Sequence, residues 1–219
     1  MCSSDLKEPS LHLFPHWNWA GRDGLEVPVW VYSNLEEVEL LLNGKSLGSQ
    51  KVPPLGHLEW KVKYEPGVIE ARGSKGGQVV LTEKRETTGE PASIRLTADR
   101  LAIDADGEDL AMVKVEVLDS LGRHVPTANS KIGFNVSGAG TLIGVGNGDP
   151  NCLESDKEPR RSLFNGLAQI IVQAGMRPGE IRIEASKEGW DGPVLTPAKL
   201  AIAARRVERR PSVPAARQG

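Results

Sequence analysis

Strict alternation of apolar and charged side chains is the feature that most constrains the fold of this chain. It runs through three segments, residues 59–64, 112–117 and 180–185. Because successive side chains of a β-strand point to opposite faces, a period of two predicts strands with one buried face and one solvated face. Strands of this kind are typical of antiparallel sheets that are packed on one side. We therefore expect sheets rather than helices.

Turn-forming residues separate the alternating segments. Asn43-Gly44 follows Glu39-Leu40-Leu41-Leu42, and this pair favours a two-residue hairpin turn because both residues tolerate a positive φ. Glycine and proline together make up about 18% of the chain, against about 12% in average proteins. No amphipathic helix of useful length is evident. The prediction is an all-β protein.

A change of pattern at residues 88–91 indicates a domain boundary. The strand expected at residues 78–82 is followed by charged residues, and a new alternation of polar and apolar residues begins at Ser93. We expect two tandem immunoglobulin-like β-sandwich domains, residues 10–88 with about five strands and residues 91–204 with about seven to eight.

The two ends differ in composition from the body. Residues 205–219 hold five Arg, one Glu and two Pro without an apolar period, which predicts a disordered basic tail. Residues 1–9 lack the apolar stretch of a signal peptide. We expect them to be a non-native or disordered start, since codons of a sequencing adapter would encode their first six residues. The compartment stays open among periplasmic, secreted and cytoplasmic locations.

Composition also bears on partners. Outside the basic residues 205–219, the chain carries a net negative charge, which argues against nucleic acid as a partner. No apolar run is long enough to span a membrane.

Each candidate motif for metal or cofactor binding is incomplete. His12 and His16 are four residues apart, but Pro15 breaks the helix that would align them. Residues 104–108 resemble a calcium loop whose glycine comes too early, so a surface turn is favoured. Residues 144–150 are glycine-rich but lack the third glycine of a dinucleotide fingerprint. We assign no metal ligand and no cofactor.

Catalytic patterns are equally weak. The sequence has no G-x-S-x-G elbow. Cys152 has no histidine close in sequence, and a pairing with the distant His124 stays open. We assign no catalytic residue.

The aromatic opening, residues 11–19, is the most unusual segment. Its Trp17 and Trp19, together with Trp30, are candidate carbohydrate-binding residues, because an indole ring covers the apolar face of a pyranose. The favoured alternative is that these side chains fill a sandwich edge and a domain interface.

The segment around Trp30 is apolar on both faces. Val27, Val29 and Val31 share one face of the expected strand, and Trp30 and Tyr32 share the other. This pattern predicts that the outer face is covered by another part of a protein.

Segments of both expected domains resemble one family, glycoside hydrolase family 2. The first group resembles the domain that follows the catalytic barrel of bacterial β-galactosidases: residues 11–19, 28–33 and 39–48. The second resembles the immunoglobulin-like domain that closes those enzymes: residues 106–110, 125–128, 144–150 and 164–168. The resemblance extends over residues 10–203.

The resemblance implies a parent enzyme that hydrolyses terminal β-galactosides or related β-glycosides with retention. Its nucleophile and its acid/base would both be Glu residues on a (β/α)₈ barrel of about 250 residues. The acid/base of the family follows an Asn, and this chain has no Asn-Glu pair. The expected role is a non-catalytic C-terminal accessory region that braces the barrel in cis, mediates assembly of a homo-oligomer, or helps to hold a carbohydrate substrate.

Two alternatives remain at this point. One is a free-standing carbohydrate-binding module that uses the three candidate tryptophans, with residues 190–192 as a further loop contact. The other is an adhesin-like spacer, since immunoglobulin-like units also serve as structural repeats. If the chain lacks its barrel, it should expose an apolar patch and self-associate.

Overall fold

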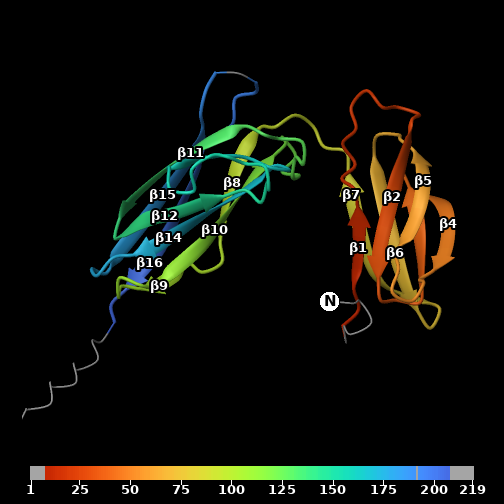
Figure 1. Ribbon diagram of the computed structural model, residues 1–219, viewed down its shortest axis with the longest axis horizontal. Coiled ribbons are helices and arrows are strands. Elements are labelled where there is room, and N and C mark those ends of the chain that lie inside the picture. Colours follow the sequence, from red (N-terminus) through yellow and green to blue (C-terminus); the bar gives the residue numbers. More distant parts are fainter. Residues whose placement is uncertain (1–7, 191, 208–219) are drawn as a thin grey trace, which may run out of the picture. The chain divides into compact units, whose positions relative to one another are not determined.

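The computed structural model describes residues 8–190 and 192–207. They form two compact units that divide after Thr88, and the described residues contain strands and no helix (Figure 1). The all-β prediction is confirmed, whereas the immunoglobulin-like assignment stays a prediction. Most of the expected start and most of the expected tail lie outside the described residues. The described part also contains no helix able to cross a membrane.

The first unit packs two antiparallel sheets face to face. One sheet has the order β1-β2-β5 and the other β4-β3-β6-β7. The strands are β1 (Leu11–Phe14), β2 (Glu26–Ser33), β3 (Glu37–Leu42), β4 (Lys45–Lys51), β5 (Leu58–Lys63), β6 (Val68–Lys75) and β7 (Gln78–Glu86). Val29 of β2, Leu40 of β3 and Ile69 of β6 are fully buried in one core between the sheets. The predicted hairpin joins β3 to β4, with positive φ at Asn43 (50°) and Gly44 (79°).

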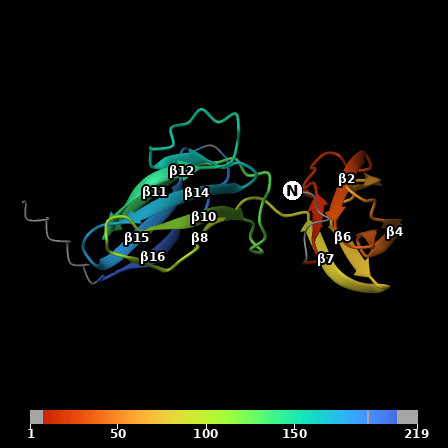
Figure 2. The same cartoon turned by 60° about the horizontal axis from the view of Figure 1, so that its bottom comes forward.

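The second unit is a larger pair of sheets, most of whose strands are labelled in Figure 2. The orders are β12-β14-β10-β8 and β13-β11-β15-β16-β9, and all pairs are antiparallel except β16 with β9. The strands are β8 (Ser93–Ala98), β9 (Ala102–Asp104), β10 (Leu110–Leu118), β11 (Lys131–Gly138), β12 (Gly140–Gly146), β13 (Arg160–Ser162), β14 (Leu167–Ala174), β15 (Gly179–Lys187) and β16 (Ala198–Arg205). Val113, Ile170 and Ile183 are fully buried in its core.

The structure has more strands than the sequence predicts. The described residues form seven strands in the first unit and nine in the second. Three of these strands have only three or four residues, namely β1, β9 and β13. So short a segment contains at most two periods of an alternating pattern, and its pairing partner decides its conformation.

Candidate functional site

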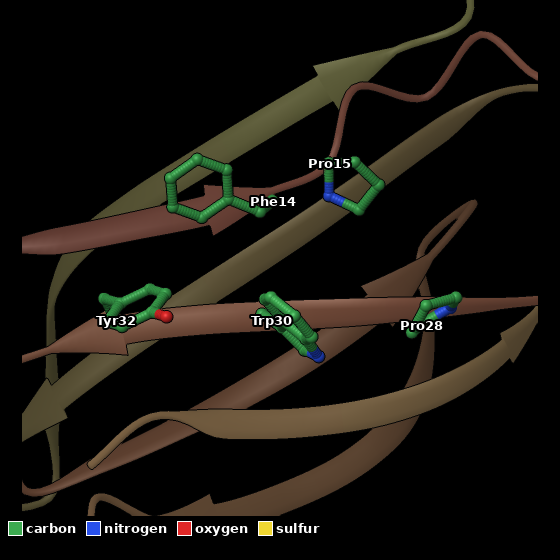
Figure 3. Close-up of a pocket in the computed structure, with 5 residues that line it drawn as sticks. All are labelled: Phe14, Pro15, Pro28, Trp30 and Tyr32. Atoms are coloured by element: carbon green, nitrogen blue, oxygen red, sulfur yellow. The ribbon is translucent and has the colours of Figure 1, made fainter.

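An apolar hollow lies on the outer face of the sheet β1-β2-β5. Five residues line it, and we call them the aromatic face: Phe14, Pro15, Pro28, Trp30 and Tyr32. Figure 3 shows Phe14 and Pro15 beside the end of β1, with Pro28, Trp30 and Tyr32 following one another along β2. The hollow has a volume of about 620 Å³. Its walls carry no charged side chain.

Strand register explains why these side chains meet. Phe14 of β1 pairs with Trp30 of β2, and directly paired residues of an antiparallel sheet project on the same face. The valines of β2 alternate with Pro28, Trp30 and Tyr32, so they fill the core while the larger rings face outward. Phe14, Trp30 and Tyr32 each keep 42% of their surface exposed. One alternating strand therefore supplies both a core face and the aromatic face.

Histidine side chains extend the aromatic face at two points. The ring of His57 stacks on Tyr32 at 5.2 Å between centroids and lies 5.4 Å from Trp30. The ring of His12 meets Phe14 edge-on at 4.2 Å, and the Phe14 ring in turn lies 5.8 Å from Tyr32. These contacts hold the rings in place relative to one another without a ligand or partner.

Carboxylates lie at the rim of the aromatic face. His12 Nδ1 is 3.4 Å from Glu83 Oε1 of β7, and Glu83 also accepts a hydrogen bond from the Leu13 backbone N–H at 2.7 Å. Glu59 of β5 pairs with Trp30 in the sheet register, so it projects on the same side as the indole. An apolar centre with a polar rim is a pattern typical of contact surfaces.

The structure does not bring the three candidate tryptophans together. Trp17 is fully buried, and its indole N–H donates to the Glu65 carbonyl at 2.9 Å. No ring face of Trp17 is open to a ligand, because the side chain belongs to the core of the first unit. Trp17 thus fills the core of the sandwich, whereas the sandwich edge and the domain interface of the favoured alternative stay predictions.

Trp19 occupies the loop between β1 and β2. Its ring stacks on His16 at 4.7 Å and has the Arg22 guanidinium 5.2 Å from its centroid. Burial lowers the pKa of His16. Trp19 is thus engaged by its own loop, and Trp30 alone of the three belongs to the aromatic face.

Sequence reasoning missed several members of the aromatic face. The alternation along β2 placed Trp30 and Tyr32 on one face and would have placed Pro28 there as well. The position of Phe14 on this face follows only from the register between β1 and β2, which the sequence does not show. His57 follows β4 and precedes β5 in a loop, where no period indicates its direction.

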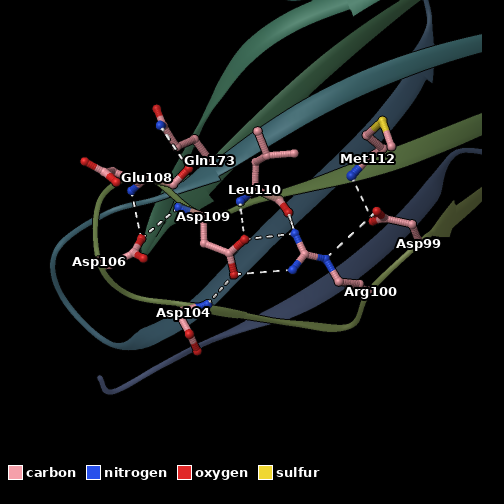
Figure 4. Close-up of polar contacts among 9 residues, drawn as sticks. All are labelled: Asp99, Arg100, Asp104, Asp106, Glu108, Asp109, Leu110, Met112 and Gln173. Atoms are coloured by element: carbon pink, nitrogen blue, oxygen red, sulfur yellow. Dashed lines mark hydrogen bonds and ion pairs between the residues drawn. The ribbon is translucent and has the colours of Figure 1, made fainter. Parts of the chain in front are cut away.

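The loop at residues 104–108 is a surface turn, as predicted, and its carboxylates hold the local backbone (Figure 4). Asp106 accepts hydrogen bonds from the backbone N–H groups of Asp109 and Glu108 at 2.7 and 2.8 Å. These donors lower the pKa of Asp106. Asp109 accepts from the Asp104 backbone N–H at 2.9 Å and pairs with Arg100 at 2.9 Å. Among the described residues, no cluster of three potential metal ligands exists.

The sequence left a pairing of Cys152 with His124 undecided, and the structure does not show this pairing. The Cys152 sulfur accepts a hydrogen bond from Arg161 Nη1 at 2.9 Å. His124 instead has its Nε2 3.0 Å from the Asn165 carbonyl. The arrangement therefore offers no thiol–imidazole pair for nucleophilic catalysis.

Family comparisons cover most of the described chain. Residues 94–196 match the family described as "Glycoside hydrolase family 2 C-terminal domain 5", and residues 24–81 match a domain of unknown function, DUF4982. The β-galactosidase BoGH2A of Bacteroides ovatus is 43% identical over 187 residues, which are 84% of this chain and 22% of that protein. The chain belongs with the C-terminal domains of glycoside hydrolase family 2.

Other relatives agree with this assignment. A putative β-glucuronidase of Formosa agariphila is 32% identical over 92% of this chain and 20% of its own length. The crystal structure of a β-glycosidase from Bacteroides vulgatus superposes with a TM-score of 0.85 at 31% identity, covering 92% of this chain and 26% of that one. The chain thus spans about a fifth of the length of these two curated relatives.

Proposed function

We propose that this chain is a non-catalytic accessory region of a family 2 β-glycosidase, in which it braces the catalytic barrel. The observation that carries the proposal is the match of 84% of the chain to only 22% of a β-galactosidase. Relatives named as β-galactosidases and β-glucuronidases both match, so the proposed activity of the whole protein is hydrolysis of a β-glycoside.

The aromatic face is the proposed contact with the barrel. A strand that is apolar on both faces is usual where both sides of a sheet are covered. Within the described residues of the first unit, the outer side of β2 leaves Trp30 and Tyr32 exposed. A surface of the barrel with exposed apolar side chains is the counterpart that this face requires. Docking there would remove the three exposed rings from water.

The proposal excludes hydrolysis by the chain alone. Purified protein should release no nitrophenol from nitrophenyl β-galactoside or nitrophenyl β-glucuronide above the rate of a buffer blank. A homologous intact β-galactosidase serves as the positive control for the substrates. Turnover that follows the protein through purification and scales with its concentration would overturn the non-catalytic assignment.

A second candidate function is carbohydrate binding on the same face. It is supported by the exposed indole of Trp30 beside Tyr32, since aromatic rings stack on the apolar side of a pyranose. Titration of the chain with a soluble galactan, followed by tryptophan fluorescence, distinguishes the two. A saturable change that disappears in Trp30→Ala favours binding of sugar at this face, and a flat titration favours the barrel contact.

A further inference from the structure

The C-terminal end of the chain contains a sequence motif that aromatic surfaces bind. Residues 209–217, which we call the proline segment, lie outside the described residues and read Arg-Arg-Pro-Ser-Val-Pro-Ala-Ala-Arg. Pro211 and Pro214 have the spacing of a P-x-x-P motif. In the polyproline II conformation three residues complete one turn, so residues at this spacing face the same side, about 9 Å apart. Segments of this kind are recognised by grooves lined with aromatic side chains.

The aromatic face has the properties of such a groove. Its hollow of about 620 Å³ falls within the range of about 300–1,000 Å³ that is typical of ligand pockets. Pro28, Trp30 and Tyr32 follow one another on the outer side of β2 (Figure 3). They extend over four residue steps, or about 13 Å, which is long enough for both prolines. The His57 ring lies against Trp30 and Tyr32, so the two rings are held in place and lose little freedom on binding.

The charges of the face and of the proline segment are complementary at one point. Glu59 of β5 lies opposite Trp30 in the sheet, and its exposed carboxylate makes no hydrogen bond or ion pair with a described residue. Glu83, by contrast, is already engaged by other side chains. The proline segment contains three Arg and no acidic residue. Lys61 lies opposite Pro28, so an arginine beside the prolines would pair with Glu59, away from Lys61.

The chain enters and leaves the second unit at opposite ends of its last strand. β8 begins at Ser93, which bridges Thr196 shortly before β16, whereas β16 ends at Arg205 beside Asp104. The nine steps from Thr196 to Arg205 span about 30 Å when extended. Pro211 follows Arg205 by six residues, which reach at most about 22 Å. The motif therefore cannot return to the point where its own chain enters the second unit, and this favours a second copy as its source.

We propose that the proline segment of one copy docks on the aromatic face of a second copy of this chain. The two prolines pack on Trp30 and Tyr32, and an arginine of the segment pairs with Glu59. Each copy has one segment and one face, so the contact joins copies reciprocally or head to tail. A barrel docked on the same face within one protein would exclude the segment, because its effective concentration is higher. The contact therefore belongs to the chain without a docked barrel.

Complementation between two variants tests the contact between copies. A chain shortened to residues 1–207 keeps the face and lacks the proline segment, whereas Trp30→Lys keeps the segment and alters the face. In sedimentation velocity, each variant alone should be monomeric at concentrations where the unchanged chain associates. An equimolar mixture of the two should form a complex, because the segment of one variant fits the face of the other. A mixture as monomeric as its components would overturn the proposal.

A synthetic peptide of residues 208–219 shows which side chains carry the contact. Titrated into the shortened chain, it should change the tryptophan fluorescence saturably. Trp30→Ala in that chain should weaken binding at least about tenfold, because aromatic residues dominate the energetics of such contacts. Replacing both prolines of the peptide by alanine should have a similar effect. Glu59→Gln should weaken binding less and reduce its dependence on salt. Trp190→Ala, in the second unit, is the matched control and should leave the affinity unchanged.

Three results of the titration would overturn the proposal. The first is equal binding of the peptide and its double-alanine form, and the second is equal affinity in Trp30→Ala and the shortened chain. The third is binding of the peptide by the shortened chain while the unchanged chain stays monomeric at all concentrations, since that result places the segment on its own chain. The contact does not rest on the accessory role, so a negative result leaves that role and its turnover test untouched.

Discussion

At the scale of single residues, Asp119 shows how one carboxylate stabilises the start of the second unit. Its side chain is 1% exposed and accepts hydrogen bonds from the backbone N–H groups of Gly89 at 2.9 Å, Leu121 at 3.0 Å and Arg123 at 2.9 Å. Arg123 Nη2 lies 2.7 Å away. Burial by itself raises the pKa of Asp119, but the donors of Gly89, Arg123 and Leu121 outweigh it and lower the pKa to about 2.

This environment makes a prediction about stability and pH. Asp119→Asn should lower the free energy of unfolding by about 2 kcal/mol at neutral pH, because the buried donors lose a charged acceptor. The pKa is lower in the folded chain than its ordinary value of 3.8, so the contribution is complete above that value and is lost as pH falls through about 2. Urea unfolding at neutral and at acidic pH measures it.

The control is Asp104→Asn, which changes an exposed carboxylate that makes no hydrogen bond to another described residue. It should alter stability by less than about 0.5 kcal/mol. If Asp119→Asn destabilises the chain equally at pH 7 and at about pH 2, the pKa argument is wrong.

At the scale of elements, β2 has two apolar sides in one alternation. Val27, Val29 and Val31 are buried, and Pro28, Trp30 and Tyr32 belong to the aromatic face. The sequence alone predicted the strand and its two apolar sides, because a period of two is visible over eight residues. It could not predict β1, whose four residues are extended because they pair with β2, nor the separation of Trp17 from Trp30, which depends on the path of the loop between the strands.

The exposed face of β2 predicts self-association of the isolated chain. Trp30→Lys should raise solubility and reduce the apparent mass at high concentration in light scattering, because a charge interrupts the apolar patch. The free energy of unfolding should change by less than about 0.5 kcal/mol, since the side chain faces solvent. Val29→Lys is the contrasting variant: it places a charge in the core and should prevent the first unit from folding. A chain that is monomeric at all concentrations before any substitution would contradict the expected role of this face.

At the scale of the whole molecule, the chain combines two β-units that each have their own core. The described residues contain no thiol–imidazole pair and no three-residue cluster of potential metal ligands, and the sequence contains no Asn-Glu pair. The family assignment could be predicted from sequence because the resemblance lies in short continuous segments, such as residues 39–48 and 144–150. The full aromatic face could not, because Phe14 reaches it only through the pairing of β1 with β2.

The accessory role is tested most directly in a chimera. The region of the Bacteroides ovatus β-galactosidase that matches this chain would be replaced by residues 10–204, and the thermal midpoint and galactosidase activity would be measured beside those of the intact enzyme. We predict activity close to that of the intact enzyme, with a lowered thermal midpoint when the chimera carries Trp30→Lys. A chimera no more stable or active than the same enzyme with the region deleted would contradict the claim that this chain braces a family 2 barrel.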